Sequence, residues 1–217
     1  MKLWKKIDWI ILIIILLMIA SGFFMAQRLP DKVPTHWDIN GEVDGYGSRY
    51  INLFLPTGLA LVVYLLMSFL PAIDPFRKNY EQFAKPYLYF KIFLTGFFIC
   101  LYFFLLYAST RSVPPEGSLM FGVPISILFL LIGWVLPQIK RNFFIGIKTP
   151  WTLSSDEVWD KTHKIGGKIF IAFGVLSLVS VLFGSVANFI VIIFGAILSA
   201  VVTVIYSYLV FRKNKQH

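Results

Sequence analysis

The chain has few charged residues and almost no cysteine for its length. Of its 217 residues, 14% are charged and one is cysteine, whereas 58% are hydrophobic. Soluble domains are about 45–50% apolar and about 25% charged, because a compact fold of this size cannot hide more apolar surface. With Cys100 as the single cysteine the chain forms no disulfide of its own, which excludes a disulfide-stabilised secreted scaffold. The composition therefore predicts an integral membrane protein.

Six segments are long and apolar enough to cross a bilayer. A spanning helix needs about 20 mainly apolar residues, because the hydrocarbon core offers no water to satisfy an open backbone. The first run is longer than the apolar region of a signal peptide and no clean cleavage site follows it, so we interpret it as a retained helix. A polar break at Ser185, Ala187 and Asn188 is expected to separate the last two spans. The predicted all-α spans are residues 7–26, 52–70, 88–109, 119–139, 168–186 and 188–211.

The basic residues fall mainly on one side of the predicted membrane. If both termini share a side, that side holds 16 Lys and Arg residues and the other holds four, Arg28, Lys32, Arg49 and Arg111. Loops that stay in the cytoplasm carry such an excess, so both termini are predicted to be cytoplasmic. The acidic residues divide six to five, and the cytoplasmic face thus accounts for the net charge of +9 without nucleic acid as a partner.

The predicted spans contain no ionisable side chain at their centres. Asp8, Lys91 and Lys168 lie near span ends, where they are expected to reach the lipid headgroups. This argues against a proton-coupled transporter. The phenylalanines of the third span are expected to face lipid. In the last span, small residues spaced by four share one helix face and favour close helix packing: Gly195, Ser199 and Thr203.

The loop after the first span, residues 27–51, is rich in turn residues. Two prolines and three glycines exclude a long helix, and Asn40-Gly41 and Asp44-Gly45 are turn dipeptides, so a short hairpin is predicted. Four side chains there could ligate a divalent cation: His36, Asp38, Glu42 and Asp44. Their spacing lacks the closing bidentate Glu of a calcium loop. We therefore expect them to solvate and cap the loop, with metal binding as the alternative.

The loop between the fourth and fifth spans, residues 140–167, is predicted to contain a short interfacial helix. Ser154 with Glu157 three residues later forms a capping box, so the helix should begin there. Gly166-Gly167 is expected to end it before the fifth span. His163 has no nucleophile beside it, so a hydrogen-bonding structural role is favoured over that of a catalytic base.

Motifs in these two loops resemble the SdpI family of bacterial membrane immunity proteins. The outer-loop motif is similar to a small module of unassigned function, DUF1648: Pro34, His36, Trp37, Gly41 and Asp44. The cytoplasmic-loop motif is similar to the signature loop of the SdpI module: Asn142, Gly146, Lys148, Thr149, Pro150, Trp151, Trp159 and His163. Lys148 stands where arginine is more frequent, which keeps the charge and loses the bidentate fork. The resemblance divides the chain into residues 1–70 (DUF1648-like), 71–118 (the third span and its loops) and 119–217 (SdpI-like).

The resemblance implies a function that the composition does not reveal. It implies a non-enzymatic protein of the bacterial cell membrane that protects against a secreted, membrane-active peptide toxin. It also implies a signalling receptor that draws a cytoplasmic transcriptional repressor to the membrane. The expected partners are the toxin, the repressor and the lipid bilayer, with no catalytic residue, no cofactor and no direct nucleic-acid contact. The alternatives are a membrane metal-binding protein or small membrane enzyme that uses the outer loop, and a transporter of a small apolar solute or peptide.

Overall fold

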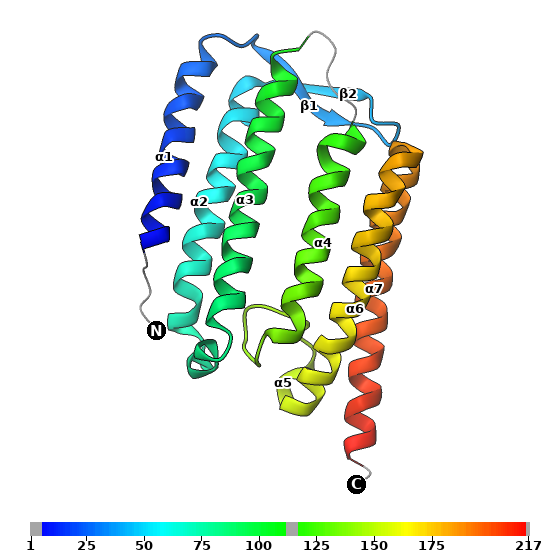
Figure 1. Cartoon of the computed structure of the whole chain (residues 1–217). Coiled ribbons are helices and arrows are strands. Elements are labelled where there is room, and N and C mark those ends of the chain that lie inside the picture. The colour runs from blue at the N-terminus through cyan, green and yellow to red at the C-terminus, as the bar shows by residue number, and fades with distance from the viewer. Residues whose placement is uncertain (1–5, 112–116, 216–217) are drawn as a thin grey trace.

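The computed structural model describes residues 6–111 and 117–215, and these form a bundle of membrane-length helices with a β-hairpin across one end (Figure 1). Six of the described helices are long and apolar enough to cross a membrane. This confirms the predicted six-span membrane fold. In chain order the elements are α1 (Lys6–Ala26), β1 (Lys32–Trp37), β2 (Val43–Ser48), α2 (Arg49–Ile73), η1 (Arg77–Glu81), α3 (Ala84–Ser109), η2 (Ser118–Gly122), α4 (Val123–Val135), η3 (Leu136–Gln138), α5 (Pro150–Ser154), α6 (Asp156–Ser180), η4 (Val181–Phe183) and α7 (Ser185–Asn214).

The two ends of the bundle differ in what they carry. Helix α1 begins and helix α7 ends at one end, which we call the terminal end (Figure 1). Strands β1 and β2 lie at the opposite end, which we call the hairpin end. The strands pair antiparallel, with Lys32 opposite Ser48, so the hairpin predicted for the first loop is confirmed.

The start of the fifth span differs from the sequence prediction. Helix α6 begins at Asp156 and runs without interruption through Gly166 and Gly167, so the predicted stop at these glycines is wrong. They permit close packing instead, because a Cβ atom at Gly167 would lie 2.6 Å from Cγ of Pro137. The short helix of this loop is α5, which ends at Ser154. The cap of α6 is the next residue, Ser155, rather than Ser154.

The break between the last two spans also lies elsewhere than predicted. Gly184 separates η4 from α7 with φ of +93°, a left-handed backbone that favours glycine. Asn188 lies inside α7 and is buried, and its side-chain amide donates to the Ser177 carbonyl (2.8 Å) and to Ser180 Oγ (3.1 Å). Asn188 therefore joins α7 to α6 and does not interrupt α7.

Helices α4, α6 and α7 approach one another closely at small residues. A Cβ atom at Gly133 of α4 would lie 2.7 Å from the Gly167 carbonyl oxygen of α6. One at Gly195 of α7 would lie 2.7 Å from the Phe173 ring of α6. Ser199 and Thr203 continue the Gly195 face and are buried, which confirms the predicted small-residue packing face.

Three buried apolar clusters hold the remaining helices together. The first cluster lies toward the terminal end and joins α2, η1, α3 and α4 to the loop before α5 and to α6: Met67, Tyr80, Phe83, Tyr87, Val135, Ile139, Ile145 and Trp159. The second lies beneath the hairpin: Met18, Ala26, Leu29, Val33, Leu53 and Tyr102. The third joins α1 to α2: Ile11, Ile15, Ala60 and Tyr64. The first cluster therefore connects the α1–α3 part of the chain to the α4–α7 part.

A buried ion pair links α1 to α3, contrary to the sequence prediction. Asp8 and Lys91 are 1% and 4% exposed, and Lys91 Nζ lies 2.5 Å from Asp8 Oδ1. The hydroxyl of Tyr64 on α2 donates to the same carboxylate. The two charges therefore meet between helices and do not reach outward to headgroups, whereas Lys168 is exposed as expected. Each charge is neutralised by the other, which is how a buried charge is tolerated.

Candidate functional site

The hairpin is fastened to the helices beneath it by buried polar contacts. Asn52, at the start of α2, donates from its side-chain amide to the Pro34 carbonyl (2.7 Å) and to Ser109 Oγ at the end of α3 (3.1 Å). Arg49 donates to the Leu29 carbonyl (2.6 Å). Pro34 of the predicted outer-loop motif is buried at this junction. The hairpin is thus held in a fixed position over the end of the bundle.

The polar residues of the hairpin form local pairs. His36 Nδ1 lies 2.5 Å from Asp44 Oδ1 across the two strands, and both side chains are largely exposed. Gly45 faces His36, and a Cβ atom there would lie 2.8 Å from the His36 Cβ atom. Asp44-Gly45 is consequently part of β2 and not the turn that we predicted. The turn is at Gly41, where φ is +84°.

Asp38 stabilises the hairpin turn through its carboxylate. Its oxygens accept from the backbone N–H groups of Asn40 and Glu42 and from the Asn40 side-chain amide, all at 2.9 Å. The hydrogen bond from the Asn40 side chain, followed by that from Glu42, holds the pKa of Asp38 below its ordinary value of 3.8. Within residues 6–111 and 117–215, no three or more His, Cys, Asp or Glu side chains lie close enough together to hold a metal ion. His36 and Asp44 are therefore brought together, while Asp38 caps the turn.

A cavity of about 310 Å³ lies between the hairpin and the ends of α4 and α7. The Trp37 and Phe121 rings meet on one side of it, with centroids 5.3 Å apart. Asn188 and Phe189 of α7 line the other side. The indole N–H of Trp37 is buried and has no hydrogen-bond partner among the described residues. Most of the lining is apolar, so the cavity suits an apolar ligand that also offers a hydrogen-bond acceptor.

The cytoplasmic-loop motif folds around Asn142, which is fully buried. Its side-chain oxygen accepts from the backbone N–H groups of Phe144 (2.9 Å) and Ile145 (2.8 Å). Its amide nitrogen donates to the carbonyls of Lys140 (2.9 Å) and Ile145 (3.0 Å). One side chain thereby satisfies four backbone groups of a segment that has no regular secondary structure.

His163 and Trp159 of α6 support the next turn of the loop. The Ile147 N–H donates to His163 Nε2 (2.9 Å), so that nitrogen carries no proton, and Nδ1–H donates to the Trp159 carbonyl (2.8 Å). The two rings are stacked, and the Trp159 indole N–H donates to the Ile139 carbonyl (2.8 Å). A Cβ atom at Gly146 would collide with the His163 ring, and φ there is +110°. The histidine is thus a neutral, buried hydrogen-bonding residue.

The remaining motif residues attach the loop to α7 or face outward. Thr149 caps α5 through a reciprocal pair of hydrogen bonds with Thr152, and its hydroxyl lies 3.1 Å from Ser207 Oγ of α7. Trp151 contacts Tyr208 of α7, with ring centroids 5.1 Å apart. Lys148 and Pro150 are exposed. The loop therefore presents a rigid surface at the terminal end.

Asp74 joins this loop to the α2–α3 connection, a role that the sequence analysis missed. The carboxylate is buried and accepts from the Phe76 N–H (2.7 Å), the Tyr80 hydroxyl (2.9 Å) and the Phe143 N–H (3.0 Å). Burial, together with the hydrogen bond to Asp74, raises the pKa of Tyr80. The only sequence signal was an acidic residue four residues after the predicted end of the second span, which a helix cap explains equally well.

Comparisons with known proteins agree with the two motifs. Residues 138–207 match the SdpI/YfhL protein family, and residues 13–61 match the domain of unknown function DUF1648. The chain is 24% identical over 210 residues to "Immunity protein SdpI" of Bacillus subtilis (strain 168), which covers 96% of this chain and 97% of that protein. No solved structure matches this chain. The chain therefore has a segment that matches DUF1648 followed by one that matches the SdpI/YfhL family, and it is similar to the SdpI immunity protein over nearly its whole length.

Proposed function

We propose that this chain is a membrane immunity protein that protects a bacterial cell from a membrane-active peptide toxin. The observation that carries the proposal is the similarity to an immunity protein across 96% of the chain, including both loops. Six membrane-length helices support it, because such a chain is positioned where a membrane-active peptide acts. We assign no catalytic role to any residue, since His163 is used in holding the loop.

The cavity beneath the hairpin is the proposed site of contact with the toxin. It lies at one end of the bundle, and the excess of basic residues at the terminal end favours an external position for the hairpin end. Its walls combine aromatic rings with the unpartnered Trp37 indole N–H, which suits the backbone carbonyl of an apolar peptide.

The proposal is tested by survival of a toxin-sensitive Gram-positive strain that expresses this chain and is challenged with an SDP-type peptide. The wild-type chain should protect, and Phe189→Ala should weaken protection because Phe189 lines the cavity. Phe194→Ala is the matched control, since Phe194 lies on the same helix with a 68% exposed side chain and does not line the cavity. Absence of protection by wild-type protein that reaches the membrane would refute the proposed function. Equal effects of the two variants would refute the cavity as the contact site.

The signature loop is the proposed contact for a cytoplasmic transcriptional repressor. Its exposed residues Lys148 and Pro150 are held on a rigid framework, which suits protein recognition. In a strain that carries the repressor and a reporter for its operator, Lys148→Glu should abolish the toxin-dependent response while the chain remains in the membrane. Lys164→Glu should keep the response, because Lys164 is also exposed but lies outside the motif. A response unchanged in Lys148→Glu would contradict this assignment.

Transport of a small apolar solute or peptide is the second candidate. The sequence argued against a proton-coupled transporter because no ionisable side chain was expected among the helices. The buried Asp8–Lys91 pair removes that argument. Flux of a labelled apolar peptide into liposomes that contain the purified chain, dependent on a pH gradient, would favour transport over immunity. Metal binding by the hairpin is tested separately, by metal content of the purified chain with and without His36→Ala.

A further inference from the structure

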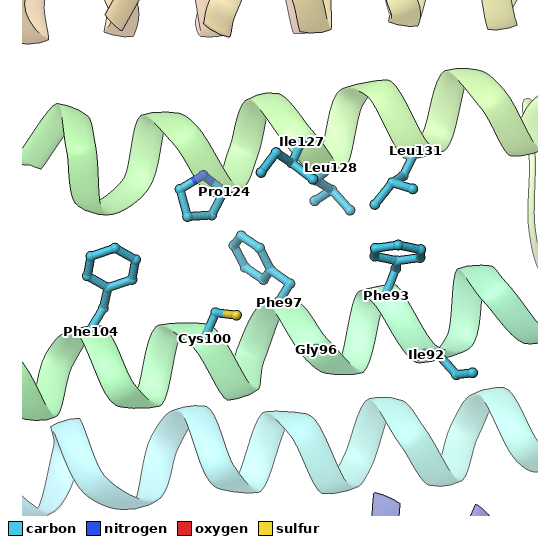
Figure 2. Close-up of a pocket in the computed structure, with 10 residues that line it drawn as sticks. All are labelled: Ile92, Phe93, Gly96, Phe97, Cys100, Phe104, Pro124, Ile127, Leu128 and Leu131. Carbon is cyan, nitrogen blue, oxygen red and sulfur yellow. The ribbon is translucent and has the colours of Figure 1, made fainter. Parts of the chain in front are cut away.

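Helices α3 and α4 contact each other toward the terminal end, at the hairpin end the segment before α4 is bonded to the hairpin, and a space lies between these two contacts. Toward the terminal end Tyr89 of α3 contacts Trp134 of α4, with ring centroids 5.9 Å apart. At the hairpin end the Gly117 N–H, just before η2, donates to the Gly41 carbonyl of the hairpin (3.2 Å). A groove of about 390 Å³ lies between these closures. Figure 2 shows the rings of Phe93, Phe97 and Phe104 extending from α3 toward α4 across the groove.

The lining of the groove carries no charge. It consists of apolar side chains and the Cys100 thiol: Ile92, Phe93, Phe97, Phe104, Pro124, Ile127, Leu128 and Leu131, with Gly96 at its floor. A Cβ atom at Gly96 would meet nothing within 4 Å, so the floor is open space. Phe93 is 45% exposed and Cys100 is exposed, so the groove reaches the outer surface of the bundle at the depth of the hydrocarbon core. Its occupant must therefore be apolar along its whole length.

The narrowness of the groove favours a hydrocarbon chain over a peptide helix. Twelve residues separate Ile92 from Phe104, which corresponds to about 18 Å along α3. A helix with side chains is about 10–12 Å across, so a segment of that length would occupy well over about 1,000 Å³. The groove offers about 390 Å³. One leaflet contributes about 15 Å of the hydrocarbon core, so a single acyl chain is narrow enough for the groove and long enough to fill the part of it nearer the hairpin end.

A basic residue, Arg111, lies beyond the groove, just after the hairpin end of α3. Tyr107 lies three residues after Phe104, which keeps it on nearly the same face of α3. The Arg111 guanidinium lies 4.6 Å from the centre of the Tyr107 ring, and the Arg111 N–H donates to the Ala108 carbonyl, so this residue continues the turn at the helix end. Tyrosine and arginine at this level are typical of the headgroup region. A guanidinium there suits a phosphate.

We propose that the groove between α3 and α4 binds one acyl chain of an anionic phospholipid, with its phosphate at Arg111. The bound lipid fills the space that the helices leave open and completes the packing between the α1–α3 part and the α4–α7 part of the chain. The inference concerns a ligand site that is separate from the proposed immunity function and does not rest on it.

The first test counts bound phospholipid by native mass spectrometry of the delipidated, purified chain titrated with phosphatidylglycerol. Wild-type protein should bind one molecule more tightly than any further molecule. Gly96→Leu should weaken the first binding step at least tenfold, because the new side chain fills the floor of the groove. Gly58→Leu is the matched control, since a Cβ atom at Gly58 of α2 also meets nothing within 4 Å and Gly58 does not line the groove. Arg111→Gln should reduce the preference for phosphatidylglycerol over phosphatidylcholine about fivefold.

A second measurement uses the wild-type chain alone and does not depend on the folding of any variant. Cys100 is the single cysteine, so its alkylation by N-ethylmaleimide reports directly on the groove. Saturation with phosphatidylglycerol should slow this alkylation at least threefold. An unchanged rate, or equal weakening by Gly96→Leu and Gly58→Leu, would overturn the proposal. The proposal would also be overturned if the delipidated wild type formed dimers and Gly96→Leu abolished them. The occupant of the groove would then be a second copy of the chain.

Discussion

Replacing Asp8 by asparagine is expected to destabilise the chain by about 3 kcal/mol. Removing one partner of a buried ion pair costs about 3–5 kcal/mol, because the remaining charge stays out of water. Here Lys91 would keep a 3.4 Å contact with Ser68 Oγ and a position 4.7 Å from the centre of the Tyr64 ring. Both contacts already exist in the wild-type chain and keep the remaining ammonium partly stabilised, so we place the loss at the lower limit of that range. Lys91→Met should cost less, because the Asp8 carboxylate keeps the Tyr64 hydroxyl and can take up a proton.

Thermal unfolding in detergent micelles, followed by loss of monodisperse elution, measures this difference. A loss of about 3 kcal/mol corresponds to a lowering of Tm by about 6–12 °C for a chain of this size. The double variant Asp8→Asn/Lys91→Met should recover most of the loss, since no charge then remains buried. An unchanged Tm in Asp8→Asn would refute the reasoning and show that Lys91 reaches the headgroups. A double variant as unstable as Asp8→Asn alone would show that packing, not charge, sets the effect.

Three further predictions concern the loops. Gly146→Ala should lower the free energy of unfolding by about 3–4 kcal/mol, because φ at Gly146 is +110° and the methyl group would meet the His163 ring. Gly184→Ala is the control in the same Tm assay. It should cost about 1–2 kcal/mol, because φ is +93° but the space around Gly184 is open. Asn142→Ala should cost about 2–4 kcal/mol, because it leaves two buried backbone N–H groups unpaired, and a Tm within 2 °C of wild type would contradict this. The pKa of Asp38 is lowered in the folded chain, so its stabilisation of the hairpin turn should be complete above pH 3.8 and be lost as the pH falls below that value. Hydrogen exchange of the Asn40 and Glu42 amides across this range measures the loss, and Asp38→Asn should abolish its pH dependence.

The sequence predicted the features that depend on length and hydropathy. All six spans and the β-hairpin were identified, because long apolar runs and turn residues encode them locally. The predicted ends of the fifth span, which is α6 in the structure, were wrong. Gly166 and Gly167 terminate an isolated helix but permit close packing when a neighbouring helix covers them, and the sequence does not state where α4 passes.

The residues of the candidate site were predictable from the sequence, but their contacts were not. His163 was expected to form structural hydrogen bonds, but its partner, the Ile147 N–H, is sixteen residues away. Asp8 and Lys91 were assigned to headgroups because each lies near a span end, and only the packing of α1 against α3 brings them together. The cavity wall from α7 was not predicted, since Asn188 was interpreted as a break in the helix and not as a buried residue within it.

The short connection at Gly184 has a consequence for how the chain enters the membrane. Helices α6 and α7 carry basic residues at their far ends, among them Lys161, Lys164, Arg212 and Lys213, whereas η4 and Gly184 carry no charge. Such a helical pair is expected to insert into the membrane as one unit during synthesis. The uncharged connection between the helices crosses the bilayer at little cost, and the two basic ends stay on the side from which the chain inserts. The charge distribution of the last two helices therefore favours the same orientation as the excess of basic residues at the terminal end of the whole bundle.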